Sequence, residues 1–330
     1  MNIAVVDVAA ESGGAASVLE YFYEQHRRDK KNHYVYLLST YHLDETENIT
    51  VVNVPWVKKG WGSRLYFDFF GVNRYLKQYG INEVLSLQNT VLPGFKGKQT
   101  VYEHNALPFS EYKFSLFEDR RMWIYQNVIG KFILYAIRRA DHVIVQTEWM
   151  KRAVTERIPG SENKTEVCFP YVMIPEIYKY QSMGKKLFFY PANSSRFKNH
   201  RLIIDACRIL KNDGYQDYSV IFTLYGNETK EISELHRMSR EEELNIEWAG
   251  PLPSENVYKL YERSVLVFPS YIETIGLPLY EASVIGSPIL AADCQYARDL
   301  LKDYDKVFFF DYRDKDKLTE YMELLMKADK

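Results

Sequence analysis

The sequence predicts an α/β protein made of two Rossmann-like domains, each a parallel sheet covered by helices on both faces. Two observations predict this fold class. Short apolar runs of strand length alternate with longer segments of helical periodicity along the chain, as in parallel sheets. The chain of 330 residues is longer than a domain with one ordinary hydrophobic core, and it fits two domains. We expect domains at 1–169 and 185–330, joined by a linker at 170–184. Their ligand cleft should lie between the carboxyl ends of the two sets of strands.

The first domain is predicted from its apolar runs, which are nearly continuous, as expected for strands buried on both faces. They place strands at 3–8, 34–39, 51–54, 83–87, 100–103 and 142–146. Helical patterns occupy 15–26, 63–78, 112–139 and 148–157. A proline-punctuated stretch without a clear period follows and predicts the linker.

The second domain repeats this alternation. Strands are expected at 187–190, 219–225, 246–249, 265–268, 288–291 and 307–310. Helices are expected at 200–211, 229–243, 279–285, from 297 and from 316, and one more ends at 263 with Ser254 as its N-cap.

Composition and charge exclude several classes of function. A net charge of −2 gives no reason to expect nucleic acid. Three separated cysteines without a CxxC motif indicate neither a disulfide framework nor a zinc site. Met1 leads directly into a predicted strand, and no apolar run approaches the roughly 20 residues that span a bilayer. We therefore expect a cytoplasmic protein.

Two glutamates, Glu273 and Glu281, stand eight positions apart around a strand-to-helix turn that contains Gly276. Glu273 follows a buried strand, and Glu281 falls about one turn into the next helix. The free N–H groups at that helix start favour an anion, and a carboxylate can accept hydrogen bonds from vicinal hydroxyls. This arrangement suits a sugar on a diphosphate. The spacing alone favours an ordinary strand–turn–helix unit whose glutamates are solvated, and the surrounding residues change that balance.

Two further loops follow strands of the predicted sheets. Gly13 and Gly14 open the first helix, where small residues let the backbone approach a ligand. This turn is not GxGxxG, so a nicotinamide cofactor is poorly supported. In the second domain, Lys198 and Arg196 precede a helix, and a cation there would stabilise a departing diphosphate. His104 ends an apolar strand, where a lone histidine is more often structural than functional.

Together these residues resemble the retaining glycosyltransferases of the GT-B fold, the large family four, whose members carry a Glu-x7-Glu signature. The resemblance is best over about 186–310, including the run Ala282 to Ile289, and looser in the first domain at Gly13-Gly14, His104 and 140–147. It implies transfer of a sugar from a nucleotide-sugar to a hydroxyl, with anomeric configuration retained.

The resemblance also implies residue roles. Glu281 would bind the ribose, and Lys198 the diphosphate. His104 would face the transferred sugar, and Gly13 and Gly14 would lie close to the diphosphate and the acceptor. The turn at Leu252 would hold the nucleobase. The donor sugar would be held by a run of five residues: Glu273, Thr274, Ile275, Gly276 and Leu277.

The sequence departs from the family pattern at three places. Asn193 stands where the family usually has an arginine, five residues before Lys198. Either Arg196 supplies that charge from a different position in the loop, or this site has one cation fewer. Thr274-Ile275 replaces a common Gly-Phe pair. Little sequence follows Phe310 to form the helix that often crosses back to the first domain.

No metal and no cofactor are expected, apart from a UDP- or GDP-linked sugar as the donor substrate. The two Asp-x-Asp copies, at 303–305 and 314–316, flank the last strand in charged turns. Two alternatives stay open. One is a nucleotide-sugar epimerase or hydrolase of the same fold, and the other is a non-catalytic nucleotide-sugar-binding scaffold.

The acceptor is expected to be a glycan or a polyprenyl-linked sugar, as in surface polysaccharide synthesis. Trp56, Lys58, Lys59 and Trp61 occupy a predicted loop, and an aromatic helix with basic residues follows later in the same domain. Interleaved aromatic and basic side chains suit a membrane interface. We therefore expect peripheral contact with the inner face of the cell membrane, with core packing as the alternative for most of these apolar positions.

Overall fold

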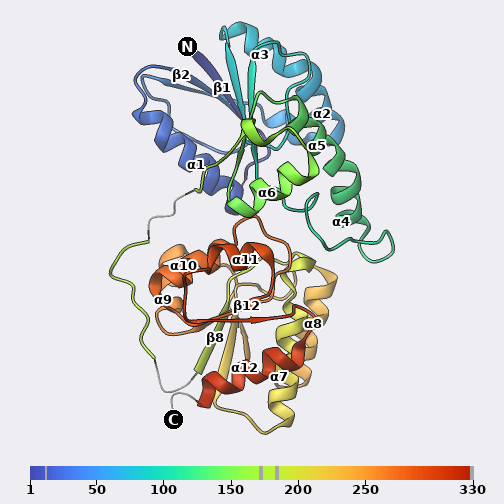
Figure 1. The fold of residues 1–330 in the computed structure, drawn as a ribbon, viewed down its shortest axis with the longest axis vertical. Coiled ribbons are helices and arrows are strands. Elements are labelled where there is room, and N and C mark those ends of the chain that lie inside the picture. Colours follow the sequence, from blue (N-terminus) through green and yellow to red (C-terminus); the bar gives the residue numbers. More distant parts are fainter. Residues whose placement is uncertain (12, 171–173, 183–185, 328–330) are drawn as a thin grey trace. The chain divides into compact units, whose positions relative to one another are not determined.

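The structure is a computed structural model that describes residues 1–11, 13–170, 174–182 and 186–327 (Figure 1). The chain divides into two compact units, Met1–Val172 and Met173–Lys330. Each unit contains one parallel sheet with helices on both faces. The predicted fold class is therefore confirmed in each unit. Part of the expected linker, at 171–173 and 183–184, lies outside the described residues, and 174–182 contains neither helix nor strand.

The first unit has a seven-stranded parallel sheet in the order β3-β2-β1-β4-β5-β6-β7. Six of its strands were predicted, with small differences in their ends. The seventh is only three residues long and lacks the apolar run that marks the others. The strands are β1 (Asn2–Asp7), β2 (His33–Leu38), β3 (Ile49–Asn53), β4 (Glu83–Ser86), β5 (Lys98–Glu103), β6 (His142–Val145) and β7 (Thr165–Val167).

Alternate residues of β1 pack into two separate cores, one on each face of the sheet. Val5 packs with Leu19 and Phe22 of helix α1 (Gly13–Arg28) on one face. Ala4 and Val6 face the other core, which includes Phe67, Val72 and Leu76 of the β3–β4 connection. This follows from the right-handed crossover rule, because β1–β2 and β3–β4 connections run in opposite directions across the sheet.

The two long helices predicted in the first unit, at 63–78 and 112–139, each contain a π-helical segment, and the second begins only at Arg120. The first runs as α2 (Trp61–Tyr66), a π-helical segment η2 (Phe67–Gly71) and α3 (Val72–Gln78). The second runs as α4 (Arg120–Ile124), a π-helical segment η3 (Tyr125–Ile129) and α5 (Gly130–Arg139). It begins late because the Asp119 side chain caps it, accepting a hydrogen bond from the Met122 N–H at 3.0 Å.

Short elements complete this unit. A 3-10 turn η1 (Pro55–Lys59) precedes α2, helix α6 (Glu148–Arg157) joins β6 to β7, and a second 3-10 turn η4 (Glu162–Lys164) lies before β7.

The second unit has a six-stranded parallel sheet in the order β10-β9-β8-β11-β12-β13. Numbered within the unit, this is 3-2-1-4-5-6, the order of the Rossmann fold, whose ligands bind at the carboxyl ends of the strands. The strands are β8 (Lys186–Tyr190), β9 (Tyr218–Phe222), β10 (Ile246–Trp248), β11 (Val265–Phe268), β12 (Ile289–Ala292) and β13 (Val307–Phe310).

Its helices lie in two layers, α7, α8 and α12 on one side and α9, α10 and α11 on the other (Figure 1). The last helix packs against α7 of the same unit. Ser254 was predicted as an N-cap, but it is the first residue of α9 and Pro253 holds the cap position. The helices are α7 (His200–Asn212), α8 (Lys230–Glu241), α9 (Ser254–Tyr261), α10 (Leu277–Ile285), α11 (Gln295–Leu300) and α12 (Lys315–Lys327).

Candidate active site

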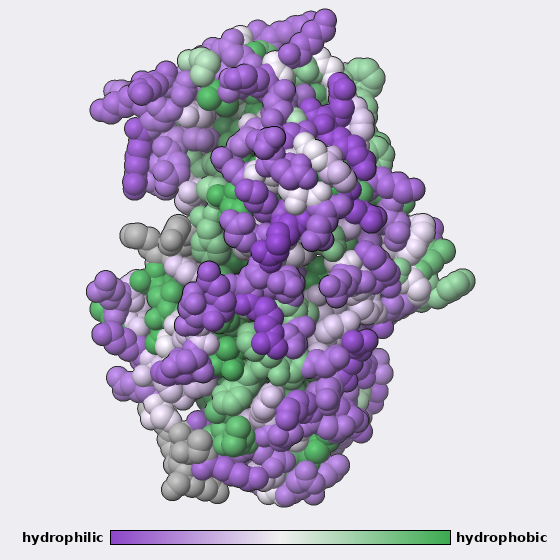
Figure 2. All heavy atoms as spheres, in the orientation of Figure 1, coloured by the Kyte–Doolittle hydropathy of each residue, from purple (hydrophilic) through white to green (hydrophobic). Residues whose placement is uncertain are grey.

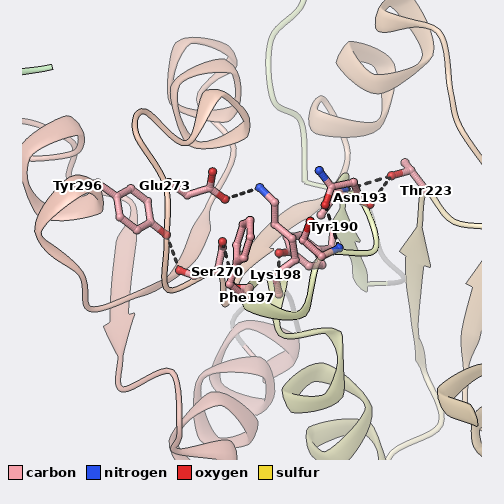
Figure 3. Close-up of polar contacts among 10 residues, drawn as sticks. Tyr190, Asn193, Phe197, Lys198, Thr223, Ser270, Glu273 and Tyr296 are labelled. Carbon is pink, nitrogen blue, oxygen red and sulfur yellow. Dashed lines mark hydrogen bonds and ion pairs between the residues drawn. The ribbon is translucent and has the colours of Figure 1, made fainter. Parts of the chain in front are cut away.

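The loop after β8 positions Lys198 through its backbone. It forms a 3-10 turn, η5 (Arg196–Lys198). The carbonyl of Phe197 accepts hydrogen bonds from the Tyr271 N–H at 3.0 Å and the Ser270 hydroxyl at 3.2 Å, which ties this loop to the one after β11. The carbonyl of Lys198 accepts a hydrogen bond from the Tyr190 hydroxyl at 2.6 Å (Figure 3).

The side chain of Lys198 forms an ion pair with Glu273, the first glutamate of the motif (Figure 3). The two side chains are only 13% and 14% exposed. The ammonium also lies 5.7 Å from the centre of the Phe197 ring and 5.8 Å from that of Phe268, within range of cation–π attraction. The structure therefore brings together a cation and a carboxylate that the sequence assigned separately to the diphosphate and the sugar.

The motif turn is built around Gly276, whose φ of +76° is in the left-handed region. A Cβ there would lie 3.1 Å from the Tyr296 ring, so a larger residue would be strained and crowded. Tyr296 in turn donates a hydrogen bond from its hydroxyl to the Ser270 carbonyl at 2.6 Å (Figure 3). Ile275 is buried, whereas Thr274 and Leu277 are half-buried at the start of α10.

Glu281 lies one turn into α10, as predicted. Its Oε2 accepts a hydrogen bond at 3.1 Å from the hydroxyl of Tyr261, which is fully buried at the end of α9. Burial raises the pKa of Glu281 to about 7, and the Tyr261 hydrogen bond opposes that rise. Burial also raises the pKa of Tyr261, so its hydroxyl stays protonated as a donor. Tyr261 was not predicted as a site residue, because nothing in its spacing marks it as the partner of Glu281.

Arg196 and Asn193 differ from Lys198 in their surroundings. Arg196 is exposed at the start of the 3-10 turn. Asn193 is also exposed, and its Oδ1 accepts a hydrogen bond from the Ser195 N–H at 2.9 Å. Asn193 therefore shapes the loop, and Lys198 is the cation that this loop brings to Glu273.

In the first unit, His104 directly follows β5, as expected. It is half-buried, and burial lowers its pKa to about 4, so the imidazole is neutral near pH 7. Its backbone N–H donates to Asn89 Oδ1 at 2.8 Å. Sequence reasoning missed its neighbour Glu103, which is fully buried and whose pKa is raised by burial.

The segment after His104 is held by Gln126 from η3. Its Oε1 accepts a hydrogen bond from the Phe114 N–H at 3.0 Å, and its Nε2 donates to the carbonyls of Leu107 at 3.1 Å and Tyr112 at 2.7 Å. Gln126 is buried. The π-helical segment thus fixes the course of the chain from residue 107 to residue 114.

The glycine pair begins α1 close to the carboxyl end of β1. A Cβ on Gly14 would meet no atom of its own unit within 4 Å, so packing inside the unit does not require glycine there. Asp7, at the end of β1, was not predicted as a site residue. It is buried, its Oδ1 accepts a hydrogen bond from the Ala10 N–H at 3.1 Å, and burial raises its pKa to about 7.

The predicted membrane loop takes a different form. Residues 55–59 are a 3-10 turn and Trp61 begins α2. Trp56 is half-buried against Tyr66 and Phe67, and Lys58 pairs with Glu11 at 2.7 Å. The prediction of an exposed loop is therefore wrong for Trp56, because its indole packs on the following helix.

A larger apolar surface lies on the helices that follow. Ten of the fifteen exposed large hydrophobic residues in the described part of the chain fall between 61 and 135. Those of α2 and η2 recur at spacings of one helix face, and so do those of η3 and α5. Figure 2 shows a hydrophobic projection at the right margin, where Figure 1 draws the loop before α4. We call this set the apolar face: Trp61, Leu65, Tyr66, Phe69, Phe70, Leu116, Phe117, Val128, Phe132 and Tyr135.

Neither Asp-x-Asp copy forms a metal-ligating cluster among the described residues. Asp303 and Asp305 are exposed before β13, and Asp314 Oδ1 accepts a hydrogen bond from the Lys317 N–H at 2.9 Å. In the described residues, no helix is both long and apolar enough to cross a membrane.

The two parallel-sheet units have the architecture of the GT-B fold, and comparisons with solved structures agree. WaaG, a glycosyltransferase involved in lipopolysaccharide biosynthesis, superimposes with a TM-score of 0.75 at 13% identity, over 98% of this chain and 90% of that one. HepE of Anabaena, in complex with UDP-glucose, gives 0.72 at 14% identity, over 99% and 90%. Sucrose-phosphate synthase of Thermosynechococcus elongatus gives 0.75 at 14%, over 99% and 90%.

The family assignment rests on the second unit. Residues 177–330, just under half of the chain, match the family described as "Glycosyl transferases group 1". No curated protein matches the chain. The predicted family resemblance is confirmed, and it supports a nucleotide-sugar glycosyltransferase.

Proposed function

We propose that this protein transfers a sugar from a UDP- or GDP-linked donor to a hydroxyl of a glycan or lipid-linked acceptor, with retention of anomeric configuration. The observation that carries the proposal is the meeting of Lys198 and Glu273 beside the start of α10, with Glu281 one turn further on. A cation, helix N–H groups and a carboxylate for vicinal hydroxyls are what a nucleoside diphosphate requires.

Each residue then has a role in the transfer. Lys198 neutralises charge that develops on the diphosphate as its bond to the anomeric carbon breaks, while the acceptor oxygen bonds to that carbon and its proton passes to the departing phosphate oxygen. Glu273 and the backbone from Thr274 to Leu277 hold the donor sugar. Glu281 accepts hydrogen bonds from the ribose. The neutral imidazole of His104 can exchange a hydrogen bond with a sugar hydroxyl without carrying charge.

Lys198 and the start of α10 supply positive charge without a metal, and we propose metal-independent transfer. In the ligand-free protein the Lys198 charge is balanced by Glu273. A bound diphosphate would share or replace that partner. The ion pair therefore holds the ammonium in place before the donor arrives, which reduces the ordering needed at the moment of reaction.

We further propose that the apolar face docks the first unit on an anionic bilayer, so that the acceptor is lipid-linked. Exposed apolar side chains that recur along one face of a helix favour an interaction site. The two segments that carry it, 56–77 and 111–139, contain eleven Lys and Arg against four Asp and Glu, in a chain of net charge −2. Aromatic side chains among basic ones fit the headgroup region of an anionic membrane.

The main proposal is tested with the full-length protein and a panel of UDP- and GDP-sugars. Donors are first ranked by thermal shift, since a ligand at 100 times its Kd stabilises by about 2.7 kcal/mol. The best donor is then offered with lipid-linked and soluble glycan acceptors, and the anomeric configuration of the product is read by NMR. Donor turnover that needs no acceptor would favour an epimerase or hydrolase instead. Binding without turnover would favour a scaffold.

A further inference from the structure

The loop after β9 presents Tyr225 in a fixed position at the carboxyl edge of the second sheet. The residue lies three positions beyond the end of β9, and its side chain is 65% exposed. Of the four exposed large hydrophobic residues in the described part of the second unit, it is the only aromatic; the others are Ile177, Val284 and Leu324.

The backbone of this loop is held by one carboxylate. Glu228 accepts hydrogen bonds from three successive N–H groups, those of Tyr225 at 2.6 Å, Gly226 at 3.1 Å and Asn227 at 3.1 Å. Such a set of convergent N–H groups around an anion restrains the chain that carries them. An exposed tyrosine on a loose loop would have to be ordered on binding, but this one already has a fixed backbone.

One side of the Tyr225 ring rests on Gly250 in the loop after β10. A Cβ on Gly250 would come within 2.5 Å of the ring, and its φ of +74° also favours glycine. The side chain as a whole is 65% exposed. We call this arrangement the aromatic platform, because backbone supports part of the ring and most of the side chain is left accessible for stacking.

The platform belongs to a continuous row of loops that also carries Lys198, the cation that we propose binds the diphosphate. The Gly250 N–H donates to the Leu224 carbonyl at 3.1 Å, joining the loops after β10 and β9. The Ala192 N–H donates to the Thr223 hydroxyl at 3.1 Å, joining the loops after β9 and β8 (Figure 3). Lys198 follows in the loop after β8. Strands lie about 4.8 Å apart, so the β10 loop is roughly 10 Å from the β8 loop along this edge.

We propose that Tyr225 is a specificity-determining residue that stacks on the nucleobase of the donor, with Leu252 as the neighbouring apolar surface. This inference rests on the proposed nucleotide-sugar donor and adds a residue that the glutamate motif does not contain. The spacing along the edge suits one nucleoside diphosphate, with its base on Tyr225 and its diphosphate at Lys198. Tyr225 contacts no reacting atom, so it acts on donor binding and not on bond cleavage.

The test measures binding of UDP, GDP, ADP, CDP, TDP and inorganic pyrophosphate to the full-length protein by calorimetry. Loss of one base–aromatic stack weakens binding about ten- to hundredfold. Tyr225→Ala should raise the Kd of the preferred nucleoside diphosphate by that factor and leave pyrophosphate unchanged. Tyr225→Phe keeps the ring and should bind like the wild type. In turnover, Tyr225→Ala should raise the KM for the donor with kcat within about twofold.

A second variant removes the backing without removing the ring. Gly250→Ala should displace Tyr225 and weaken nucleotide binding in the same direction, and a melting curve checks that the protein is folded. Equal Kd values for wild type and Tyr225→Ala, or equal loss of pyrophosphate and nucleotide binding, overturn the role of Tyr225 alone. Failure of the wild type to bind any of the five nucleotides overturns the proposed donor and this inference together.

Discussion

Lys198 and Glu273 form an ion pair although they stand 75 positions apart in the chain. Each lies in a loop that follows a central strand, β8 or β11, and these strands are neighbours in the sheet. The backbone bonds from Tyr271 and Ser270 to Phe197 hold the two loops together below the pair. Lys198 and Glu273, the residues that we propose for the diphosphate and the donor sugar, are therefore held together, and changing one alters the electrostatic environment of the other.

Replacement of Lys198 by alanine should reduce kcat by about a hundredfold to a thousandfold, the usual cost of removing one preorganised donor to a developing charge. The melting temperature should fall much less, because the rest of the loop is held by backbone hydrogen bonds that do not use the ammonium. Steady-state kinetics and a melting curve on the same preparation measure both effects.

Arg196→Ala is the matched control for that experiment, because Arg196 is a cation two residues away but exposed. It should keep most of the activity. A dispensable Lys198 with an essential Arg196 would show that this loop presents its cation differently when the donor is bound.

Nucleotide affinity should depend on the protonation of Glu281. Its pKa is raised to about 7 by burial, and only the carboxylate accepts hydrogen bonds from both ribose hydroxyls. Affinity should therefore rise as pH increases through 7 and fall below it. Glu281→Gln should weaken binding, since hydrogen bonds to a charged group are worth about 1.5–3 kcal/mol, and should remove this pH dependence.

Tyr261→Phe provides the sharper version of the same test. The Tyr261 hydroxyl lowers the pKa of Glu281, so its removal should move the midpoint to higher pH while the carboxylate is retained. Calorimetry from pH 6 to pH 8.5 gives the midpoint for each variant, with Glu281→Gln correcting for titration of the phosphate itself. Identical profiles for wild type and Glu281→Gln would remove Glu281 from the ribose site.

The site in the second unit was largely predictable, because its residues are close in sequence or at strand ends. The strand at 265–268, Gly276 and the place of Glu281 within α10 follow from apolar runs and turn chemistry. The pairing of Lys198 with Glu273 requires the strand order, which no local pattern gives. Tyr261 and Tyr225 were not predicted because their importance comes from contacts across elements.

In the first unit the misses have a local cause. The π-helical segments add residues within helices whose apolar period looks continuous in sequence. Trp56 has the composition of an exposed loop, but the ring packs on Tyr66 and Phe67. A pattern of residue types cannot distinguish an aromatic side chain that packs on a neighbouring helix from one that faces solvent.

Turnover should persist in excess EDTA. Lys198 and the N–H groups at the start of α10 supply the positive charge that a metal would otherwise give. The aspartates of the Asp-x-Asp copies are exposed beside β13, and Asp314 is used to cap α12. Initial rates are compared with and without chelator at saturating donor. Loss of turnover that manganese restores would mean that a metal, and not Lys198 alone, carries the diphosphate.

Gln126→Leu should destabilise the protein by about 3 kcal/mol or more. It leaves one backbone N–H and two carbonyls of the 107–114 segment without the partner that they have now, and each buried unsatisfied group costs about 1–3 kcal/mol. Urea unfolding measures the loss. Asn127→Leu is the neighbouring control, because its side chain bonds only within its own helix, to the Trp123 carbonyl. Equal stability of the two variants would show that the segment is held by other contacts.

Binding to anionic vesicles should require the apolar face. Phe70 is 68% exposed and Phe117 99% exposed, and basic residues near the surface add about 1 kcal/mol each on an anionic membrane. Wild type should co-sediment with anionic vesicles at low salt, less at high salt, and little with neutral ones. A variant with Trp61, Phe70, Phe117 and Phe132 changed to serine should stay in the supernatant.

The matched control changes exposed apolar residues of the second unit, Ile177, Val284 and Leu324, and should bind like the wild type. Equal sedimentation of both variants would place the contact elsewhere. If the wild type does not bind vesicles but self-associates in solution, and the quadruple variant does not self-associate, then a second copy of this chain covers the apolar face. A soluble acceptor would then be the better proposal.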